Sequence, residues 1–137
     1  MKKYIVLLSV ALMLLITPAS ANTTYSPIRG ENADNDSLVA PRLAGIGQTA
    51  YQQKKVTAGA NGVVFTKAIT ADRLVHFRMV DRDGDIATWS DYMGPYSSRN
   101  TLPGNYKQQA GIHIKLQVQA KSIIYGTTVR GSWKSDN

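Results

Sequence analysis

Residues 112–120 have the sequence Ile112-His113-Ile114-Lys115-Leu116-Gln117-Val118-Gln119-Ala120. Every even-numbered position is apolar and every odd-numbered position is polar, so the apolar residues repeat with a period of two. Because the side chains of an extended strand point alternately to opposite faces, this pattern predicts a half-buried β-strand with one wet face. A helix would scatter the same apolar residues around its circumference, and β-branched isoleucine and valine also favour the pleated backbone.

Further segments on both sides have the composition of short strands and are separated by turn signals. One of them follows Asp83-Gly84, a dipeptide that favours the positive φ angles of a tight hairpin. No stretch of residues 22–137 has the apolar stripe that a helix would bury. Together these features predict an all-β fold, either a small antiparallel β-sandwich or a barrel, with about six to eight strands. The strands expected besides 112–120 are 52–58, 62–69, 74–80, 86–89 and 123–133.

The last two expected strands are close in sequence. Residues 112–120 end just before Lys121-Ser122, and we expect this pair to close a hairpin with 123–133. In 123–133 the period of two places one set of side chains on a single side: Ile123, Tyr125, Thr127, Val129 and Trp133. In 74–80 the same period places Val75, Phe77 and Met79 on one face.

The beginning of the chain has the pattern of a secretory signal peptide. Lys2 and Lys3 precede an uncharged run at 5–16, and the sequence Thr17-Pro18-Ala19-Ser20-Ala21 follows it. The twelve residues of this run would make about 18 Å of helix, well short of a bilayer core of about 30 Å. We therefore expect cleavage after Ala21 and a secreted product, extracellular or loosely associated with the cell wall.

The predicted organisation has three parts: a signal peptide at 1–21, a flexible polar arm or pro-segment at 22–41, and a single β-domain at 42–137. The middle part is polar, lacks a periodic apolar pattern and holds the only glutamate, Glu31.

The charge is positive and cysteine is absent. The 137 residues contain 16 Lys and Arg against 9 Asp and Glu, a net charge of +7, and 42–137 alone keeps a charge of +7. Without cysteine, disulfide scaffolds, thiolate zinc sites and thiol nucleophiles are excluded. An exported cationic protein suits an anionic envelope polymer or a membrane surface better than nucleic acid, because its lysines and arginines are scattered. Ordinary solubility accounts for the same charge.

An aromatic-rich stretch at 89–106 is the candidate binding surface. Planar rings on a loop stack against sugars or insert into a partner surface, and nearby cations pair with phosphate or carboxylate. The alternative is that Trp89 and one or two tyrosines fold inward and cap the core. The candidate ligand-binding residues are Trp89, Tyr92, Tyr96, Arg99, Tyr106 and Lys107.

Asp81, Asp83 and Asp85 have the first three spacings of a calcium-binding EF-hand loop. Ile86 stands where that loop needs glycine, and Tyr92 stands where it needs a bidentate glutamate. A turn at Asp83-Gly84 with solvated neighbours explains the same residues with fewer assumptions, so calcium is the weaker of the two interpretations.

Catalysis has little support in the sequence. His76 and His113 are the only histidines, both fall inside expected strands, and neither a Gly-x-Ser-x-Gly nor a His-Glu-x-x-His motif occurs. A glycosidase would have to use aspartates alone, since Glu31 lies in the expected arm. We therefore expect no enzymatic activity and no cofactor, with a hydrolase as the weak alternative.

Three parts of the sequence resemble a loosely defined set of short, secreted bacterial β-proteins of uncharacterised activity. These parts are Val80-Asp81-Arg82-Asp83-Gly84-Asp85, the strand at 112–120, and the closing run Val129-Arg130-Gly131-Ser132-Trp133-Lys134-Ser135-Asp136. The resemblance covers residues 74–137 at most, and Lys134 interrupts the tryptophan–serine pair of the closing motif. It implies an exported β-protein and supplies no activity.

The leading hypothesis from the sequence is a secreted, non-enzymatic β-domain that binds an anionic polymer or glycan of the cell envelope, or another exported protein. The alternative is a secreted cationic antimicrobial, bacteriocin-like or toxin-like protein. It rests on export, charge and small size, although the mature chain lacks the amphipathic helix that commonly inserts into membrane interfaces.

Overall fold

The strand expected from the alternating pattern is present as β8 (His113–Ala120). Its apolar side chains are buried and its polar side chains are wholly or partly exposed, as the period of two requires. The buried residues are Ile114, Leu116, Val118 and Ala120.

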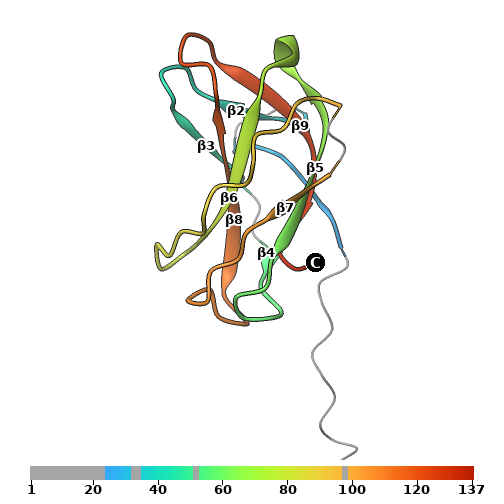
Figure 1. The fold of residues 1–137 in the computed structure, drawn as a ribbon. Helices are drawn as coiled ribbons and strands as arrows, with labels where there is room; N and C mark the ends of the chain where they lie inside the picture. The colour runs from blue at the N-terminus through green and yellow to red at the C-terminus, as the bar shows by residue number, and fades with distance from the viewer. Residues whose placement is uncertain (1–23, 32–34, 51–52, 97–98) are drawn as a thin grey trace, which may run out of the picture.

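The computed structural model describes residues 24–31, 35–50, 53–96 and 99–137, which form two antiparallel sheets (Figure 1). The all-β prediction is confirmed, and the two sheets enclose one core as a sandwich. The described residues form more strands than the expected six to eight because short strands make up several edges. The nine strands are β1 (Ser26–Pro27), β2 (Leu38–Ala40), β3 (Ile46–Gln48), β4 (Gln53–Lys54), β5 (Gly62–Ile69), β6 (Val75–Asp81), β7 (Asn100–Leu102), β8 and β9 (Thr127–Lys134).

Each sheet is built around one long strand from the last third of the chain. In the five-stranded sheet, β9 pairs with β5, and β7 extends the sheet beyond β5. The other edge of β9 pairs with β1 and β2. In the four-stranded sheet, β8 pairs with β6 along most of its length, and with β3 and β4 near its two ends. Because β6 occupies one whole edge of β8, β3 and β4 share the opposite edge.

The core lies between the two sheets. Phe77 and Met79 of β6 and Leu116 of β8 face it from one side, and Val64 of β5 and Trp133 of β9 face it from the other. All five are fully buried. The expected common face of Val75, Phe77 and Met79 is thereby confirmed.

The prediction of a flexible arm at 22–41 is wrong for the residues of this segment that the structure describes. β1 and β2 complete the edge of β9, and Ile28, Leu38 and Ala40 are buried in the core. Pairing with a preformed edge needs only two or three residues, which is too short to leave a periodic signal. The expected signal peptide at 1–21 lies outside the described residues.

The expected hairpin at Lys121-Ser122 is also wrong. β8 and β9 are neighbours in sequence but belong to different sheets, so the chain crosses from one layer to the other between them. β9 begins only at Thr127, and Ile123 and Tyr125 are exposed instead of facing the core. The later members of the predicted face, Thr127, Val129 and Trp133, are buried.

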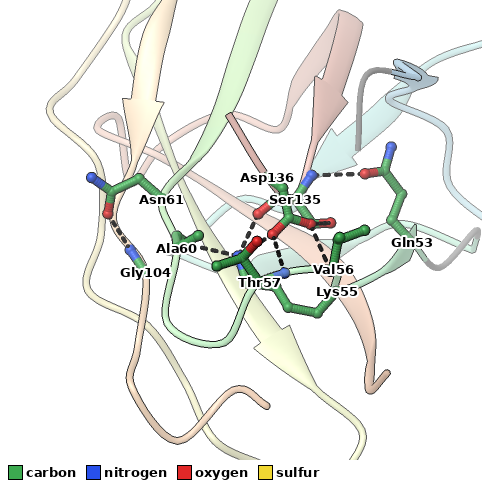
Figure 2. Close-up of polar contacts among 9 residues, drawn as sticks. All are labelled: Gln53, Lys55, Val56, Thr57, Ala60, Asn61, Gly104, Ser135 and Asp136. Atoms are coloured by element: carbon green, nitrogen blue, oxygen red, sulfur yellow. Dashed lines mark hydrogen bonds and ion pairs between the residues drawn. The ribbon is translucent and has the colours of Figure 1, made fainter. Parts of the chain in front are cut away.

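A buried polar cluster holds the carboxyl end of the chain against the segment after β4 (Figure 2). The Lys55 ammonium donates to the carbonyls of Ala60 and Ser135 and lies 3.5 Å from Asp136 Oδ1. The Asp136 carboxylate accepts hydrogen bonds from the N–H groups of Val56 and Thr57, both at 3.0 Å, and from the Ser135 hydroxyl. Burial lowers the pKa of Lys55, and the charge of Asp136 opposes that shift.

Gln53 extends this cluster to β1. Its side-chain amide donates to Ser26 Oγ and to the Trp133 carbonyl, and its Oε1 accepts from the Ser135 N–H at 2.7 Å. The closing residues that carried the sequence resemblance therefore have a structural role. Through these hydrogen bonds they connect the end of the chain to both sheets.

Within the described parts of the chain, no helix has the length and apolar composition needed to span a membrane.

Candidate functional site

The outer face of the four-stranded sheet carries an unusual row of stacked side chains. The antiparallel register sets His76 opposite Gln119 and Arg78 opposite Gln117, at positions that alternate with the buried residues of β6 and β8. These four side chains therefore point away from the core.

The row is a continuous stack of rings capped by a cation at each end. The His76 ring is sandwiched between Trp89, at a centroid distance of 4.1 Å and an angle of 5°, and Tyr92, at 4.3 Å and 7°. The Arg78 guanidinium lies 4.2 Å from the centroid of Trp89, and the Lys121 ammonium lies 5.5 Å from that of Tyr92. Cations over ring faces are attracted by the negative face of the π-system, so each ring helps to position its cation.

The segment after the Asp83-Gly84 turn places Trp89 and Tyr92. It follows β6 without forming a regular strand, because it advances three residues for every two residues of β6. Backbone hydrogen bonds join Ala87 to Met79, Ser90 to Phe77, and Met93 to Val75. All three residues on the segment side of these bonds are buried. The residue before each of the last two, Trp89 or Tyr92, falls over the outer face.

Hydrogen bonds fix the polar members of the face. The His76 ring nitrogen Nε2 lies 2.9 Å from Gln119 Oε1, and Arg78 Nε donates to Gln117 Oε1 at 2.8 Å. Gln117 in turn donates to Gln48 Oε1 of β3 at 2.9 Å. The outer face is therefore an ordered ladder of side chains across three strands.

The strand positions of this face carry only positive charges. The charged side chains at its outward strand positions are Lys54, Arg78 and Lys115, and all are cationic. Asp81, at the end of β6, is turned inward and only 5% exposed. Burial lowers the pKa of Arg78, but a guanidinium remains charged at neutral pH.

A cleft of about 260 Å³ continues the face toward the end of β6. Arg82, His113 and Lys115 contribute side chains to its lining, with Gln48, Val80 and Asp81. An anion is the ligand that such a lining favours.

A larger groove of about 510 Å³ lies on the outer side of the other sheet. Its lining mixes Lys67 and Arg130 with the carboxylate of Asp36, and Tyr25 and Phe65 add aromatic surface. The Asp36 carboxylate lies 3.8 Å from Arg29. Like the cleft at the end of β6, this groove combines two cations with one acid, so what distinguishes the stacked face is its ordered rings and not the charge of its cleft.

The structure brings together only part of the predicted binding surface. Trp89 and Tyr92 belong to the stack, and Trp89 lies on the outer face instead of capping the core. Tyr96 is 88% exposed and Tyr106 is 79% exposed, and neither ring stacks on another ring within the described residues.

The two predicted cations of that surface also lie elsewhere. The Arg99 guanidinium donates to Asn137 Oδ1 at 3.0 Å, beside the carboxyl end of the chain. Lys107 is exposed on the loop that follows β7, and its N–H donates to Asn105 Oδ1 within that loop.

Asp81, Asp83 and Asp85 form a turn. The Asp81 Oδ1 atom accepts the N–H groups of both Asp83 and Asp85 at 2.9 Å, and Gly84 has the expected positive φ of 86°. Among the described residues, no group of three or more histidine and acidic side chains is placed to hold a metal. Calcium binding stays a prediction.

The sequence reasoning missed the residues that organise the face, namely His76, Arg78 and Lys121. The signal for the first two was present, since alternation in 74–80 places both opposite the Phe77 face. Their stacking with Trp89 required the three-residue advance of the following segment, which a period of two does not reveal.

No protein-family model matches the chain, and no curated protein matches it at a significant level.

Proposed function

We propose that the protein is a secreted, non-enzymatic β-domain that binds an anionic polymer of the cell envelope through the outer face of its four-stranded sheet. The observation that carries this proposal is the ordered stack with a cation at each end, on a face whose outward strand charges are all positive. Export rests on the signal-peptide pattern of the sequence.

The arrangement of the stack favours charge recognition over sugar stacking. Both faces of the Trp89 ring are occupied, one by His76 and the other by Arg78. One face of Tyr92 is covered by His76, and Lys121 lies over the ring. The rings therefore hold the cations in place, and the guanidinium and ammonium groups contact the ligand. A chain of phosphates or carboxylates fits this face better than a neutral glycan.

The test compares charge-matched variants. The double variant Arg78→Gln with Lys115→Gln removes two cations from the face, and Arg99→Gln with Lys107→Gln removes two from elsewhere. The probes are purified cell-wall material, a defined polyglycerol phosphate, and neutral dextran. We expect the face variant to lose about tenfold in affinity for the two anionic probes, which corresponds to about 1.4 kcal/mol, and the matched variant to lose much less.

Trp89→Ala tests whether the stack matters as such, with Tyr96→Ala as its aromatic control. The first should weaken retention on wall material because Arg78 loses the ring that positions it, and the second should not. Equal losses in both charge variants would show that binding follows net charge alone. Full retention by the face variant would reject this surface.

A further inference from the structure

We propose that one end of the sandwich docks into the surface of an anionic lipid bilayer. Its apolar residues are not part of the stacked face, which shares only Lys121 with this end, and the inference does not depend on polymer binding. The end in question carries five exposed apolar side chains on three loops, which we name the apolar tip: Leu43, Leu74, Ile123, Ile124 and Tyr125.

Backbone contacts hold the three loops together. The Leu43 N–H donates to the Ile123 carbonyl at 2.7 Å, which joins the loop after β2 to the loop after β8. The Lys121 N–H donates to the Leu74 carbonyl at 2.9 Å, which adds the loop before β6. Figure 1 shows these loops at the top of the molecule, at the end away from the carboxyl terminus.

The tip exposes aliphatic surface to an extent that the rest of the described chain does not. Leu43 is 76% exposed, Ile124 is 65% exposed and Ile123 is 60% exposed. Among the large aliphatic residues that the structure describes, only Val39 of the neighbouring β2 is also more than half exposed. Single exposed apolar residues are ordinary, but a contiguous group marks an interaction site.

The backbone of these loops is held in an unfavourable conformation. All described non-glycine residues with positive φ lie in two of the tip loops: Leu43 (64°), Ala44 (56°), Ala71 (54°) and Asp72 (53°). Such angles are uncommon for residues with a Cβ, and they concentrate where a structure must present particular groups. Here they accompany the projection of Leu43 into solvent.

The charges around the tip select the kind of partner. Arg42, Arg73 and Lys121 belong to the three loops, against a single acid, Asp72. The Arg73 guanidinium lies 4.6 Å from the centroid of Tyr125 and donates to the Gly126 carbonyl, so this cation is fixed beside the apolar side chains. Aliphatic side chains at a projecting end, with an aromatic residue and cations next to them, match the acyl boundary and the anionic headgroups of a bilayer.

The absence of cysteine allows a direct test with the full chain. Ile124→Cys carries a polarity-sensitive dye at the tip, and Ile86→Cys carries it at an apolar position that is 44% exposed beside the Asp83-Gly84 turn. With phosphatidylglycerol vesicles, we expect a blue shift and at least about a twofold rise in fluorescence at position 124 but not at position 86. With phosphatidylcholine vesicles, the change at 124 should be much smaller.

A sedimentation assay gives a second measurement on unlabelled protein. Ile123→Ser with Ile124→Ser should lower binding to phosphatidylglycerol vesicles about tenfold relative to Ile86→Ser, at an unchanged melting temperature. Because every variant keeps residues 5–16, any binding through that apolar run is common to all of them. Equal signals at 124 and 86, or unchanged sedimentation of the serine pair, would overturn the proposal. A tip dye that responds to a protein fraction and to no vesicle would also overturn it.

Discussion

Removing the Asp136 carboxylate should destabilise the fold more than removing any exposed acid. Asp136→Ala leaves the Lys55 ammonium, whose side chain is 0% exposed, with two carbonyl acceptors and no counter-charge. It also leaves the N–H groups of Val56 and Thr57 without their hydrogen-bond acceptor. Breaking a buried ion pair by deleting one partner costs about 3–5 kcal/mol, a large share of the roughly 5–15 kcal/mol that stabilises an ordinary domain.

The assay is urea denaturation followed by the far-ultraviolet circular-dichroism signal. The midpoint should fall while the slope with urea stays the same, because the surface exposed on unfolding hardly changes. The matched control is Asp83→Ala, whose side chain is 58% exposed and pairs with Arg82 at 3.8 Å. An exposed pair of this kind contributes about 0–1 kcal/mol. Lys55→Met combined with Asp136→Ala should recover part of the loss, because no uncompensated charge then stays buried.

A loss below about 1 kcal/mol for Asp136→Ala, similar to that of Asp83→Ala, would refute this reasoning, because so small a loss is typical of surface substitutions. It would mean that water reaches the Lys55 ammonium once the carboxylate is gone. If the double variant recovers no stability, the whole loss instead comes from the N–H groups of Val56 and Thr57, which have lost their acceptor.

Four further outcomes follow from particular residues. Gln53→Leu should lower the free energy of unfolding by about 1–3 kcal/mol, measured in urea, because it leaves buried partners of the amide unpaired. Gly131→Ala should cost about 3 kcal/mol or more and broaden or abolish the melting transition, because the new Cβ would lie 2.0 Å from the Phe65 carbonyl oxygen. Burial lowers the pKa of Lys55 from its ordinary value of 10.5. Between the lowered pKa and pH 10.5, the unfolded chain therefore binds more protons than the folded chain. The free energy of unfolding should rise with pH in this range in wild type but not in Lys55→Met. Melting should be the same in calcium and in chelator, because Asp81 Oδ1 already accepts two N–H groups of its turn and no group of acidic side chains in the described residues is placed to hold a metal. A gain of about 2.7 kcal/mol at 100 times the dissociation constant would establish a calcium site instead.

The sequence predicted those strands of which one face is exposed to solvent and the other is buried. The alternation at 112–120 reports the environment of β8 directly, and the buried series in β6 follows the same rule. Alternation does not state which sheet a strand joins. That is why β8 and β9 were expected to pair with each other, although each is the centre of a different sheet.

Short edge strands were the second feature of the fold that the sequence could not predict. β1 and β2 have two and three residues, so their register depends on β9 and not on a pattern of their own. Their local sequence is polar and resembles a linker. Pairing with β9 and the burial of Ile28, Leu38 and Ala40 distinguish this segment from a linker, and both are tertiary properties.

The candidate site was predictable in composition but not in arrangement. Trp89 and Tyr92 were singled out as aromatic residues on a loop, and they do lie at the surface. The partner that brings them together is His76, whose role depends on a segment that advances three residues for every two of β6. A cluster defined by proximity in sequence therefore contained Tyr96 and Tyr106, which the structure places outside the stack.

The two proposed surfaces meet at Lys121, and this fixes how they would act together. Lys121 follows the last residue of β8, lies over the Tyr92 ring at one end of the stack, and belongs to a loop of the apolar tip. β6 and β8 are antiparallel and extend between the tip and the opposite end of the sandwich (Figure 1). With the tip in a bilayer, β6 and β8 would stand upright on the membrane. The stacked face would then be exposed sideways, to the layer just outside the membrane. An anionic envelope polymer would meet the cationic face there, so lipid docking and polymer binding would reinforce each other through the same orientation.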